Sequence, residues 1–441
     1  MARNIFGTDG IRGTANTGFI TPVNATKIAM AVINYYLDKS HISANKRFTV
    51  VIGKDTRLSG YMLESALTAG FISAGADVIL LGPIPTPGVA FITRSLRADL
   101  GVVISASHNP YHDNGIKFFN SEGFKISPTD EEAISKIFLS EVLLESDVIG
   151  KAKRLDDAAG RYIEFAKSSF PKNLTLNGMK LVVDAANGAA YKIAPKIFWE
   201  LGADVTTIGN EPNGQNINQN CGATFTDTLR KKVVETKSDI GIALDGDADR
   251  LIMVDETGEV IDGDFLIAAI ATAWKESNRH KSNSVVATIM SNSGLADYLK
   301  SIGFVLDTCS VGDKYVIEKM LQNGSSIGGE KSGHIIPIDY SSTGDGCISA
   351  IQILSYLKQT GKKASDIRKL YTPHPQIFIN IKKIFNDDEI RVVKSIETIL
   401  GNEGRVIVRK SGTEPLTRIM LESKNAAKLS QAKDLLNKII S

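Results

Sequence analysis

The chain has 441 residues, of which 43% are hydrophobic and 23% charged, as is typical of a folded protein with several domains. Its 51 Lys and Arg residues nearly balance 49 Asp and Glu residues, and a net charge of +2 argues against a nucleic-acid or anionic-membrane partner. Neither an apolar signal segment nor a membrane-length apolar run is present, and Cys221, Cys309 and Cys347 lack the spacing of a disulfide framework or a zinc site, so we expect a cytoplasmic protein.

Strands and helices alternate in the first 150 residues. The β-branched run Phe48–Gly53 predicts a strand, and apolar residues at helical spacing over Met62–Ser73 predict a helix that stops at Gly75. Two further apolar runs, Val78–Leu81 and Gly101–Ile104, predict strands. Such alternation is typical of βαβ units, so we expect an α/β domain.

The same order of elements recurs twice. LVVDAANGAA (Leu181–Ala190) is expected to open a helix that ends near Gly202, and GADVTTIG (Gly202–Gly209) echoes GADVILLG (Gly75–Gly82). A third pass contains two predicted strands and two predicted helices, namely Ser284–Met290, Phe304–Thr308, Ser293–Ser301 and Tyr315–Gln322. Three related α/β domains are the economical interpretation.

Interruptions of this pattern mark the expected domain boundaries. They fall near Ile149–Arg154, Met253–Gly263 and Thr360–Pro375. The predicted fold class is α/β, with three related α/β domains that have mixed sheets and a smaller C-terminal α+β domain. The expected domains are residues 1–150, 151–253, 254–366 and 367–441. Polar loops that follow their apolar strands are the candidate ligand sites, because open α/β sheets bind ligands there.

The loop SASHNP follows the predicted strand Gly101–Ile104. Ser107 is a candidate nucleophile or phosphoryl acceptor, and His108 or Lys117 is a candidate for proton transfer. The alternative is a plain Asn-Pro turn in which the serines cap backbone groups.

The loop DGDADR lies between two predicted strands. Asp245, Asp247 and Asp249 stand at alternate positions and offer hard oxygen ligands to a divalent cation. Together with Glu256 they match the ligand positions of a calcium EF-hand, but Arg250 replaces the glycine of its sharp turn and the flanks are predicted strands, so calcium is disfavoured. Magnesium held by three ligands keeps coordination sites for a phosphate oxygen, and a solvated acidic loop is the alternative.

The loop GEKSGH (Gly329–His334) combines glycines with polar side chains. Glu330 and Ser332 are candidates for hydrogen bonds to hydroxyl or amino groups of a sugar, while the glycines let a ligand approach the backbone. The alternative is a glycine-rich turn with one charged pair, and His334 fits either interpretation.

The loop RKSGTEP (Arg409–Pro415) is followed by Arg418. Arginine, hydroxyl groups and glycine amides on one turn form a phosphate cradle. The alternative is a β-hairpin turn with exposed charge.

The N-terminal segment FGTDGIRG (Phe6–Gly13) places Arg12 among glycines, where it suits an anion held against close backbone. The alternative is a flexible turn. A serine, an aspartate triad, a hydroxyl-binding loop and a phosphate cradle on successive domains together predict phosphoryl transfer on a phosphosugar.

These motifs resemble those of the α-D-phosphohexomutases. FGTDGIRG, SASHNP, NGIKFF, DGDADR, GEKSGH and RKSGTEP occur in the family's order and cover essentially the whole chain. The resemblance implies four domains around a central cleft, a Mg2+ cofactor and a phosphosugar substrate. We expect a monomer or a homodimer.

The resemblance also implies a role for each motif. Ser107 is expected to carry a phosphoryl group, and that phosphate would bind magnesium with the aspartate triad, Asp245, Asp247 and Asp249. Four residues match positions around the phosphoserine: Arg12, His108, Lys117 and Arg250. Lys117 and His334 are alternative proton carriers.

On the substrate side, Glu330 and Ser332 would hold sugar hydroxyls. The non-reacting phosphate would be held by Arg409, Ser411, Gly412, Thr413 and Arg418. The implied reaction interconverts glucosamine 6-phosphate and glucosamine 1-phosphate, with glucosamine 1,6-bisphosphate as intermediate and activator, and feeds UDP-N-acetylglucosamine synthesis.

Alternative functions share these residues. A phosphomannomutase or phosphoglucomutase differs only in what it tolerates at C2 of the sugar. In a magnesium-dependent phosphatase, water would intercept phospho-Ser107. A non-catalytic phosphosugar sensor is disfavoured, because binding alone does not need both the serine and the aspartate triad.

The chain departs from the family's pattern at three positions. Lys331 stands where members acting on glucosamine phosphates usually have glutamine, Lys410 where proline is usual, and Lys314 where arginine is usual. If residues 330–332 are extended, Lys331 lies between two inward-facing residues and points away from the cleft. Preference for the amino sugar would then be retained.

Overall fold

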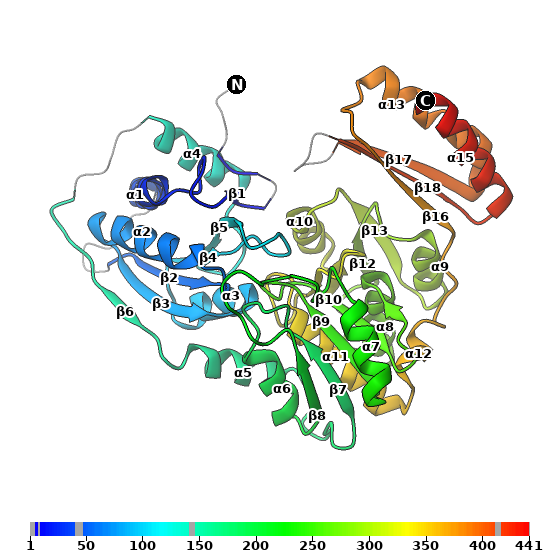
Figure 1. Cartoon of the computed structure of the whole chain (residues 1–441), viewed down its shortest axis with the longest axis horizontal. Helices are drawn as coiled ribbons and strands as arrows, with labels where there is room; N and C mark the ends of the chain where they lie inside the picture. The colour runs from blue at the N-terminus through cyan, green and yellow to red at the C-terminus, as the bar shows by residue number, and fades with distance from the viewer. Residues whose placement is uncertain (1–4, 8, 40–46, 141–145, 411–415, 441) are drawn as a thin grey trace.

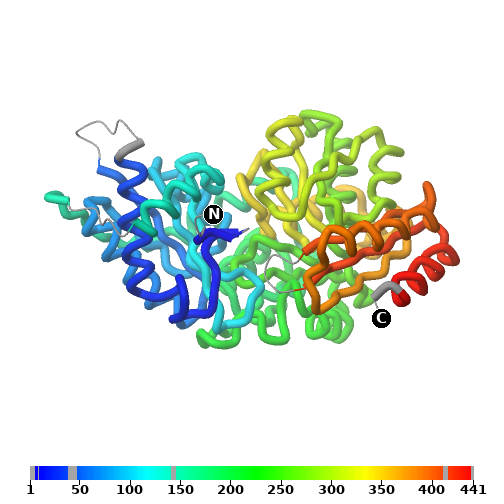
Figure 2. The backbone as a smooth tube through the Cα atoms, turned by 90° about the horizontal axis from the view of Figure 1, so that it is seen from above, coloured from blue at the N-terminus to red at the C-terminus, as the bar shows by residue number. Residues whose placement is uncertain are grey.

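The computed structural model describes residues 5–7, 9–39, 47–140, 146–410 and 416–440. These residues form four sheets, each flanked by helices (Figure 1). The domains follow one another in an arc, from the blue and cyan first domain through the green second and yellow-green third to the orange and red C-terminal domain. Seen from above, the C-terminal domain lies beside the third domain and far from the first (Figure 2).

The first domain has a six-stranded sheet in the order β1-β5-β4-β2-β3-β6, in which β5 is antiparallel to both neighbours and the other pairs are parallel. The strands are β1 (Ile11–Thr14), β2 (Thr49–Lys54), β3 (Asp77–Pro83), β4 (Leu100–Ile104), β5 (Asp113–Asn120) and β6 (Ala152–Arg154). The helices are α1 (Pro22–Lys39), α2 (Ser59–Ser73), α3 (Thr86–Ser95) and α4 (Pro128–Leu139). Val50 and Ile52 pack under α1 and α2 while Val51 faces the α3 side, so both faces of β2 are buried and its sequence is apolar throughout.

The second domain has a five-stranded sheet in the order β11-β10-β9-β7-β8. Its strands are β7 (Lys180–Asp184), β8 (Asp204–Ile208), β9 (Ile240–Leu244), β10 (Leu251–Asp255) and β11 (Val260–Ile261), and its helices are α5 (Ala158–Ser168), α6 (Ile193–Glu200) and α7 (Asp227–Thr236). The strand β9 is parallel to β7 and antiparallel to β10, so the β9–β10 connection is a short loop at the sheet's edge.

The third domain has a four-stranded sheet in the order β13-β12-β14-β15. Its strands are β12 (Ser284–Thr288), β13 (Val305–Cys309), β14 (Ile327–Gly329) and β15 (Ile335–Pro337). Its helices are α8 (Gly263–Glu276), α9 (Ser293–Ser301), α10 (Asp313–Asn323), α11 (Gly346–Thr360) and α12 (Ala364–Ile367). None of the described helices is long and apolar enough to cross a membrane.

The C-terminal domain has an antiparallel sheet in the order β16-β18-β17. Its strands are β16 (Gln376–Ile381), β17 (Gly404–Lys410) and β18 (Thr417–Ser423). Its helices are α13 (Asp387–Lys394), α14 (Glu397–Leu400) and α15 (Ala426–Ile440), with a 3-10 turn at Gly401–Glu403. The predicted class, three α/β domains with mixed sheets and a smaller α+β domain, is confirmed.

The predicted elements differ from the observed ones mainly at their ends. The helix predicted from Met62 begins earlier, at Ser59. The prediction missed this start because Ser59 and Gly60 carry no apolar periodicity. The stretch Leu181–Ala190, expected to open a helix, contains the strand β7 and a turn, and the helix begins only at Ile193. The first two domains were expected to end at residues 150 and 253. The strands β6 and β11 come after these positions, yet they belong to the sheets of the first and second domains.

One hydrophobic cluster extends through the three α/β domains, beside separate clusters within each of them. One cluster joins Val103 of the first domain, Val183 of the second and Ile267 of the third. The C-terminal domain has a separate cluster around Val406, Ile419 and its helices. The first three domains are therefore packed as one apolar body, whereas the fourth folds around its own core.

Candidate active site

The polar loops gather around one cavity because each follows a strand whose end faces the centre of the arc. The cavity has a volume of about 430 Å³ and takes residues from all four domains. Of the expected site residues it is lined by Arg12, His108, Asp249, Arg250, Glu330, Ser332, His334, Arg409 and Arg418. A larger hollow of about 640 Å³ beside α3 and α5 contains none of these residues.

Ser107 stands three residues after the end of β4 and next to His108, which lines the cavity. Its side chain is buried, and its Oγ donates a hydrogen bond of 2.6 Å to Oδ2 of Asp245. Nδ1 of His108 lies 3.3 Å from Ser107 Oγ. Ser107 has a φ of 53°, a left-handed conformation that L-residues other than Gly, Asn and Asp seldom adopt. The surrounding contacts must therefore hold it there.

The contact that holds the serine loop is a buried ion pair that the sequence analysis missed. Arg57 and Asp55 are fully buried and bonded at 2.8 Å between Nε and Oδ2. The Arg57 guanidinium also donates to the carbonyl oxygens of Ser107 at 3.0 Å and Asn109 at 2.8 Å. Polar residues follow the apolar strand β2 in KDTR just as they follow β4 in SASHNP, so the same rule would have found this pair.

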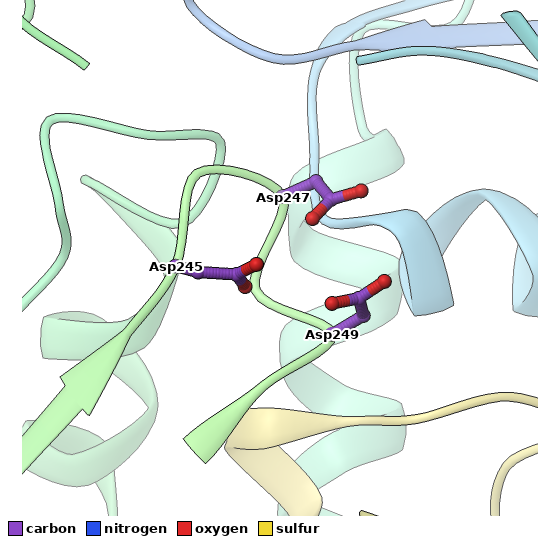
Figure 3. Close-up of side chains that lie close together, drawn as sticks. All are labelled: Asp245, Asp247 and Asp249. Carbon is purple, nitrogen blue, oxygen red and sulfur yellow. The ribbon is translucent and has the colours of Figure 1, made fainter. Parts of the chain in front are cut away.

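The side chains of the aspartate triad gather on the loop between β9 and β10 (Figure 3), and Asp245 accepts the Ser107 hydroxyl from the neighbouring domain. All three carboxylates are buried and offer ligand atoms within 4.8 Å of one another. The loop comes this close because residue 246 is glycine: a Cβ on Gly246 would lie 2.5 Å from the carbonyl oxygen of Ser107. The first domain supports the triad, since Thr86 Oγ1 donates to Asp247 Oδ2 at 2.7 Å.

The triad fits a divalent cation. Oδ1 of Asp247 and Oδ1 of Asp249 are buried and have no hydrogen-bond partner among the described residues. Burial and the charges of Asp249 and Asp247 raise the pKa of Asp245 to about 7. Hard carboxylate oxygens without a donor are the ligands that Mg2+ takes, and a bound cation would relieve their repulsion.

Lys117 is the counter-ion of the triad in this structure. Its Nζ lies 2.9 Å from Asp247 Oδ2, 3.5 Å from Asp249 Oδ2 and 3.2 Å from Asp9 Oδ2. Burial alone would lower the pKa of Lys117, but these carboxylates raise it above its ordinary value. The lysine is therefore held as an ammonium.

A chain of charges continues from Asp9 to the third domain. Lys125 bonds both Asp9 and Asp313, and Arg12 bonds Asp9. Burial would raise the pKa of Asp9, but Lys117, Lys125 and Arg12 lower it well below its usual range. Asp9, Lys125 and Asp313 were missed by the sequence analysis, because separate segments meet only in the fold.

The two histidines differ in their surroundings. Burial and the positive charges of Arg250 and Arg12 lower the pKa of His108 to about 3, so its ring is neutral. His334 is buried between Asp249 and Asp313, which raise its pKa although burial alone would lower it. Nε2 of His334 nevertheless lies 3.1 Å from the backbone N–H of Gly344, and this donor requires an unprotonated Nε2. The hydrogen bond thus fixes the tautomer with the proton on Nδ1.

The GEKSGH loop makes a turn at the cavity wall. Glu330 Oε1 accepts the N–H of Gly312 at 3.1 Å, and Ser332 Oγ lies 3.4 Å from Glu330 Oε2. The N–H of Gly333 bonds the carbonyl of Glu330, so residues 330–333 are not extended and the alternation argument for Lys331 was wrong. Lys331 lines the cavity wall, but its Nζ bonds Gln376 Oε1 at 2.6 Å and lies 3.8 Å from Asp262.

The described part of the predicted phosphate cradle consists of two arginines on adjacent strands. Arg409 of β17 and Arg418 of β18 are opposite each other in the sheet register, and both line the cavity. Burial and the neighbouring charge of Arg418 lower the pKa of Arg409. Two guanidinium groups side by side repel each other, and an anion bound between them relieves this repulsion. Ser411, Gly412 and Thr413 lie outside the described residues.

Comparison with known proteins agrees with this architecture. Family models described as phosphoglucomutase/phosphomannomutase alpha/beta/alpha domains I, II and III match residues 3–144, 160–258 and 262–374, and the C-terminal domain model matches residues 362–439. Four such domains in this order define a phosphohexomutase.

Relatives over the whole length narrow the assignment. Phosphoglucosamine mutase of Paramagnetospirillum magneticum is 52% identical over 436 residues, 96% of each chain. Phosphoglucosamine mutase of Rhizobium etli is 51% identical over 439 residues, 98% of this chain and 96% of the relative. The chain belongs to the phosphoglucomutase/phosphomannomutase family of isomerases, and within it to the bacterial phosphoglucosamine mutases.

Solved structures share the fold at low identity. A phosphoglucomutase/phosphomannomutase family protein from Burkholderia thailandensis has a TM-score of 0.84 at 24% identity, covering 100% of this chain and 97% of its own. N-acetylphosphoglucosamine mutase of Aspergillus fumigatus, solved with GlcNAc-6P and magnesium, has a TM-score of 0.63 at 17% identity, covering 81% of this chain and 93% of its own.

Proposed function

We propose that the enzyme interconverts glucosamine 6-phosphate and glucosamine 1-phosphate through a phosphorylated Ser107 and glucosamine 1,6-bisphosphate. The observation that carries the proposal is the Ser107 hydroxyl, which is buried and bonded to Asp245 in a triad where Asp247 and Asp249 each keep one oxygen without a donor. A hydroxyl in that position is placed to exchange a phosphoryl group at a metal site.

The reaction balances without any other reactant. The P–O bond to Ser107 breaks while a bond forms from phosphorus to the free sugar hydroxyl, whose proton ends on Ser107 Oγ. The bisphosphate then reorients, and its other phosphoryl group passes to Ser107 by the reverse exchange. The product is the isomeric monophosphate, and the serine is again phosphorylated.

Magnesium is proposed to be held by Asp245, Asp247, Asp249 and the phosphate on Ser107, where it would neutralise charge on the transferring group. Arg12 and Arg250 line the same wall of the cavity and would hold phosphoryl oxygens.

The proton carriers can be distinguished by their contacts. Lys117 is held as an ammonium, so it can give a proton to the leaving oxygen, although its raised pKa makes it a weak acid, and it cannot remove the proton of the sugar hydroxyl. His334 already accepts the Gly344 N–H at Nε2, so it suits orientation of Asp249 better than proton removal. Neutral His108 lies against Ser107 Oγ and orients that hydroxyl.

The substrate is proposed to span the cavity. Glu330 and Ser332 would hold the sugar, and Arg409 and Arg418, with the neighbouring Ser411, Gly412 and Thr413, would hold the non-reacting phosphate. We also propose that the enzyme is cytoplasmic and that it is a monomer or a homodimer. Light scattering after gel filtration would decide between these two oligomeric states.

The test begins with the intact mass of the purified enzyme before and after phosphatase treatment. Loss of one phosphoryl group should abolish turnover of glucosamine 1-phosphate, and a catalytic amount of the 1,6-bisphosphate should restore it. Ser107→Ala should lower turnover by several orders of magnitude. The matched control Ser121→Ala, on the exposed loop after β5, should be normal. Near-normal turnover in Ser107→Ala would refute the mechanism.

Substrate choice needs a separate measurement. We expect kcat/KM to be higher for glucosamine phosphate than for glucose or mannose phosphate, and the opposite order would make the enzyme a phosphoglucomutase or phosphomannomutase. Inorganic phosphate released as fast as product would indicate a phosphatase. Excess chelator should remove activity and Mg2+ should restore it; full activity in chelator would exclude the metal.

A further inference from the structure

The C-terminal domain carries the arginine pair, yet apolar packing does not fix its orientation on the rest of the molecule. Its sheet turns alternate residues such as Ile377, Val406 and Ile419 to its own helices. This cluster shares no buried residue with the core of the other three domains. Polar contacts with the third domain therefore set the domain's position, both from the opposite face of the sheet and from Lys424, which pairs with Asp297 of α9.

That opposite face is polar. Glu422 of β18 lies opposite Gln376 of β16 on one side and opposite Arg405 of β17 on the other. Arg409 and Arg418 lie four residues further along β17 and β18, and the two-residue side-chain period places them on the same face. One end of the face carries a carboxylate with its partners, and the other end carries the arginine pair.

Glu422 is the centre of a joint with the third domain. It is 1% exposed, and its Oε1 accepts Arg405 Nε at 3.1 Å and the backbone N–H of Ser293, at the start of α9, at 3.2 Å. Gln376 Nε2 donates to Oε2, and Arg405 also donates to the carbonyl of Ser291. We call Glu422, Arg405 and Gln376, with Ser291 and Ser293, the Glu422 joint.

The joint is linked to the sugar-binding loop as well. Lys331 Nζ donates to Gln376 Oε1 at 2.6 Å and lies 5.6 Å from the ring centroid of Phe378, the next residue on this face of β16. The turn that carries Glu330 and Ser332 is thereby connected to the sheet that carries the arginines. Both ends of a bound phosphosugar would depend on the same contacts.

We infer that Glu422 is a positioning residue, which holds the C-terminal sheet against α9 so that Arg409 and Arg418 project over the cavity at the distance of the substrate's non-reacting phosphate. Four residues of strand span about 13 Å, so a rotation of roughly 10° at the joint would move the arginines by about 2 Å. Hydrogen bonds to a phosphate do not survive such a shift.

The kinetic test rests on the proposed function. Glu422→Leu should raise KM for glucosamine 6-phosphate at least about tenfold while kcat changes less than about threefold, because the non-reacting phosphate is held equally in ground and transition states. Glu422→Gln keeps one acceptor oxygen, which can serve both Ser293 and Arg405, and should show a smaller rise. Glu403→Leu removes an exposed pair with Lys428 in the same domain and should leave KM unchanged.

A second measurement does not depend on activity. Hydrogen exchange of the peptide containing Ser293 should accelerate in Glu422→Leu and not in Glu403→Leu, because the Ser293 N–H loses its acceptor. An unchanged KM together with unchanged exchange would overturn the inference, and so would a fall in kcat at constant KM. If Glu422→Leu does not fold, Arg405→Met, which removes the donor shared by Glu422 and the Ser291 carbonyl, carries the kinetic part of the test. If exchange accelerates while wild-type enzyme does not turn over glucosamine phosphates, the joint stands and the proposed substrate fails.

Discussion

Replacing Arg57 by lysine should loosen the serine loop without removing a charge. The guanidinium makes five hydrogen bonds, one to Asp55 and four to the carbonyl oxygens of Ser107, Asn109, Pro110 and Asp113. A lysine ammonium has three donors and no planar fork, so at least two of the five bonds are lost.

The magnitude follows from those losses. Most of these carbonyls keep another donor, because Asn218 Nδ2 also bonds those of Ser107 and Asn109 and the Asp113 N–H bonds that of Pro110. Two lost hydrogen bonds, each worth about 0.5–1.5 kcal/mol, therefore cost about 1–3 kcal/mol. Since 1.4 kcal/mol is a factor of ten, the loop should open at least roughly fivefold more often than in the wild type. Ser107 Oγ would then lose its fixed distance to Asp245, and we expect turnover to fall about tenfold to a hundredfold.

The assay is hydrogen exchange of a peptide covering residues 105–113, in parallel with mutase kinetics. The control is Arg161→Lys on α5, where Arg161 pairs with Asp157 at the surface at 2.9 Å and should matter little. Wild-type exchange in the 105–113 peptide of Arg57→Lys would refute the conclusion that the Asp55–Arg57 pair holds the loop. Faster exchange with unchanged turnover would show that the left-handed conformation of Ser107 is not needed for chemistry.

Three further outcomes are expected. Burial and Asp262 raise the pKa of Asp264 to about 7. The folded state therefore gains stability from this proton below the unfolded value of 3.8 and loses it as pH rises through about 7. Asp264→Asn, which keeps an oxygen for the Asn292 N–H, should lessen the fall in thermal midpoint between about pH 5 and pH 8, and an undiminished fall would contradict this account. Arg418→Ala should raise KM roughly tenfold to a hundredfold, for a loss of about 1.5–3 kcal/mol, while intact mass still shows phospho-Ser107; an unchanged KM would mean that the arginine pair does not hold phosphate. Lys331→Gln should alter the preference among sugar phosphates less than tenfold, because Nζ is engaged by Gln376 and Asp262; a reversal of preference would assign Lys331 to the sugar's C2 group.

Local sequence determined the parts of the site that lie within one loop. DGDADR places three carboxylates at alternate positions on a short turn, and the structure brings them within 4.8 Å of one another as expected for a metal site. SASHNP follows a buried strand, and Ser107 lies in the turn after β4. In these loops the turn residues and the flanking apolar runs suffice, because the contacts that matter are only a few residues apart.

Lys331 shows where local reasoning failed. The alternation rule assumed an extended segment, but the Gly333 N–H closes a turn on Glu330, and the direction of the lysine is set by acceptors 45 and 69 residues away, Gln376 and Asp262. Nothing in GEKSGH specifies those partners.

By itself the sequence determined the fold class, the order of the domains and the chemical types in each loop, because strand and helix periodicity and turn composition are local properties. Only the tertiary structure decided that Asp245 meets Ser107, that Arg57 fixes the loop from another strand, and that Glu422 connects the fourth domain to the third. Those contacts join residues 138, 50 and 129 positions apart. Their geometry is set by how separate sheets pack, which no short stretch of sequence encodes.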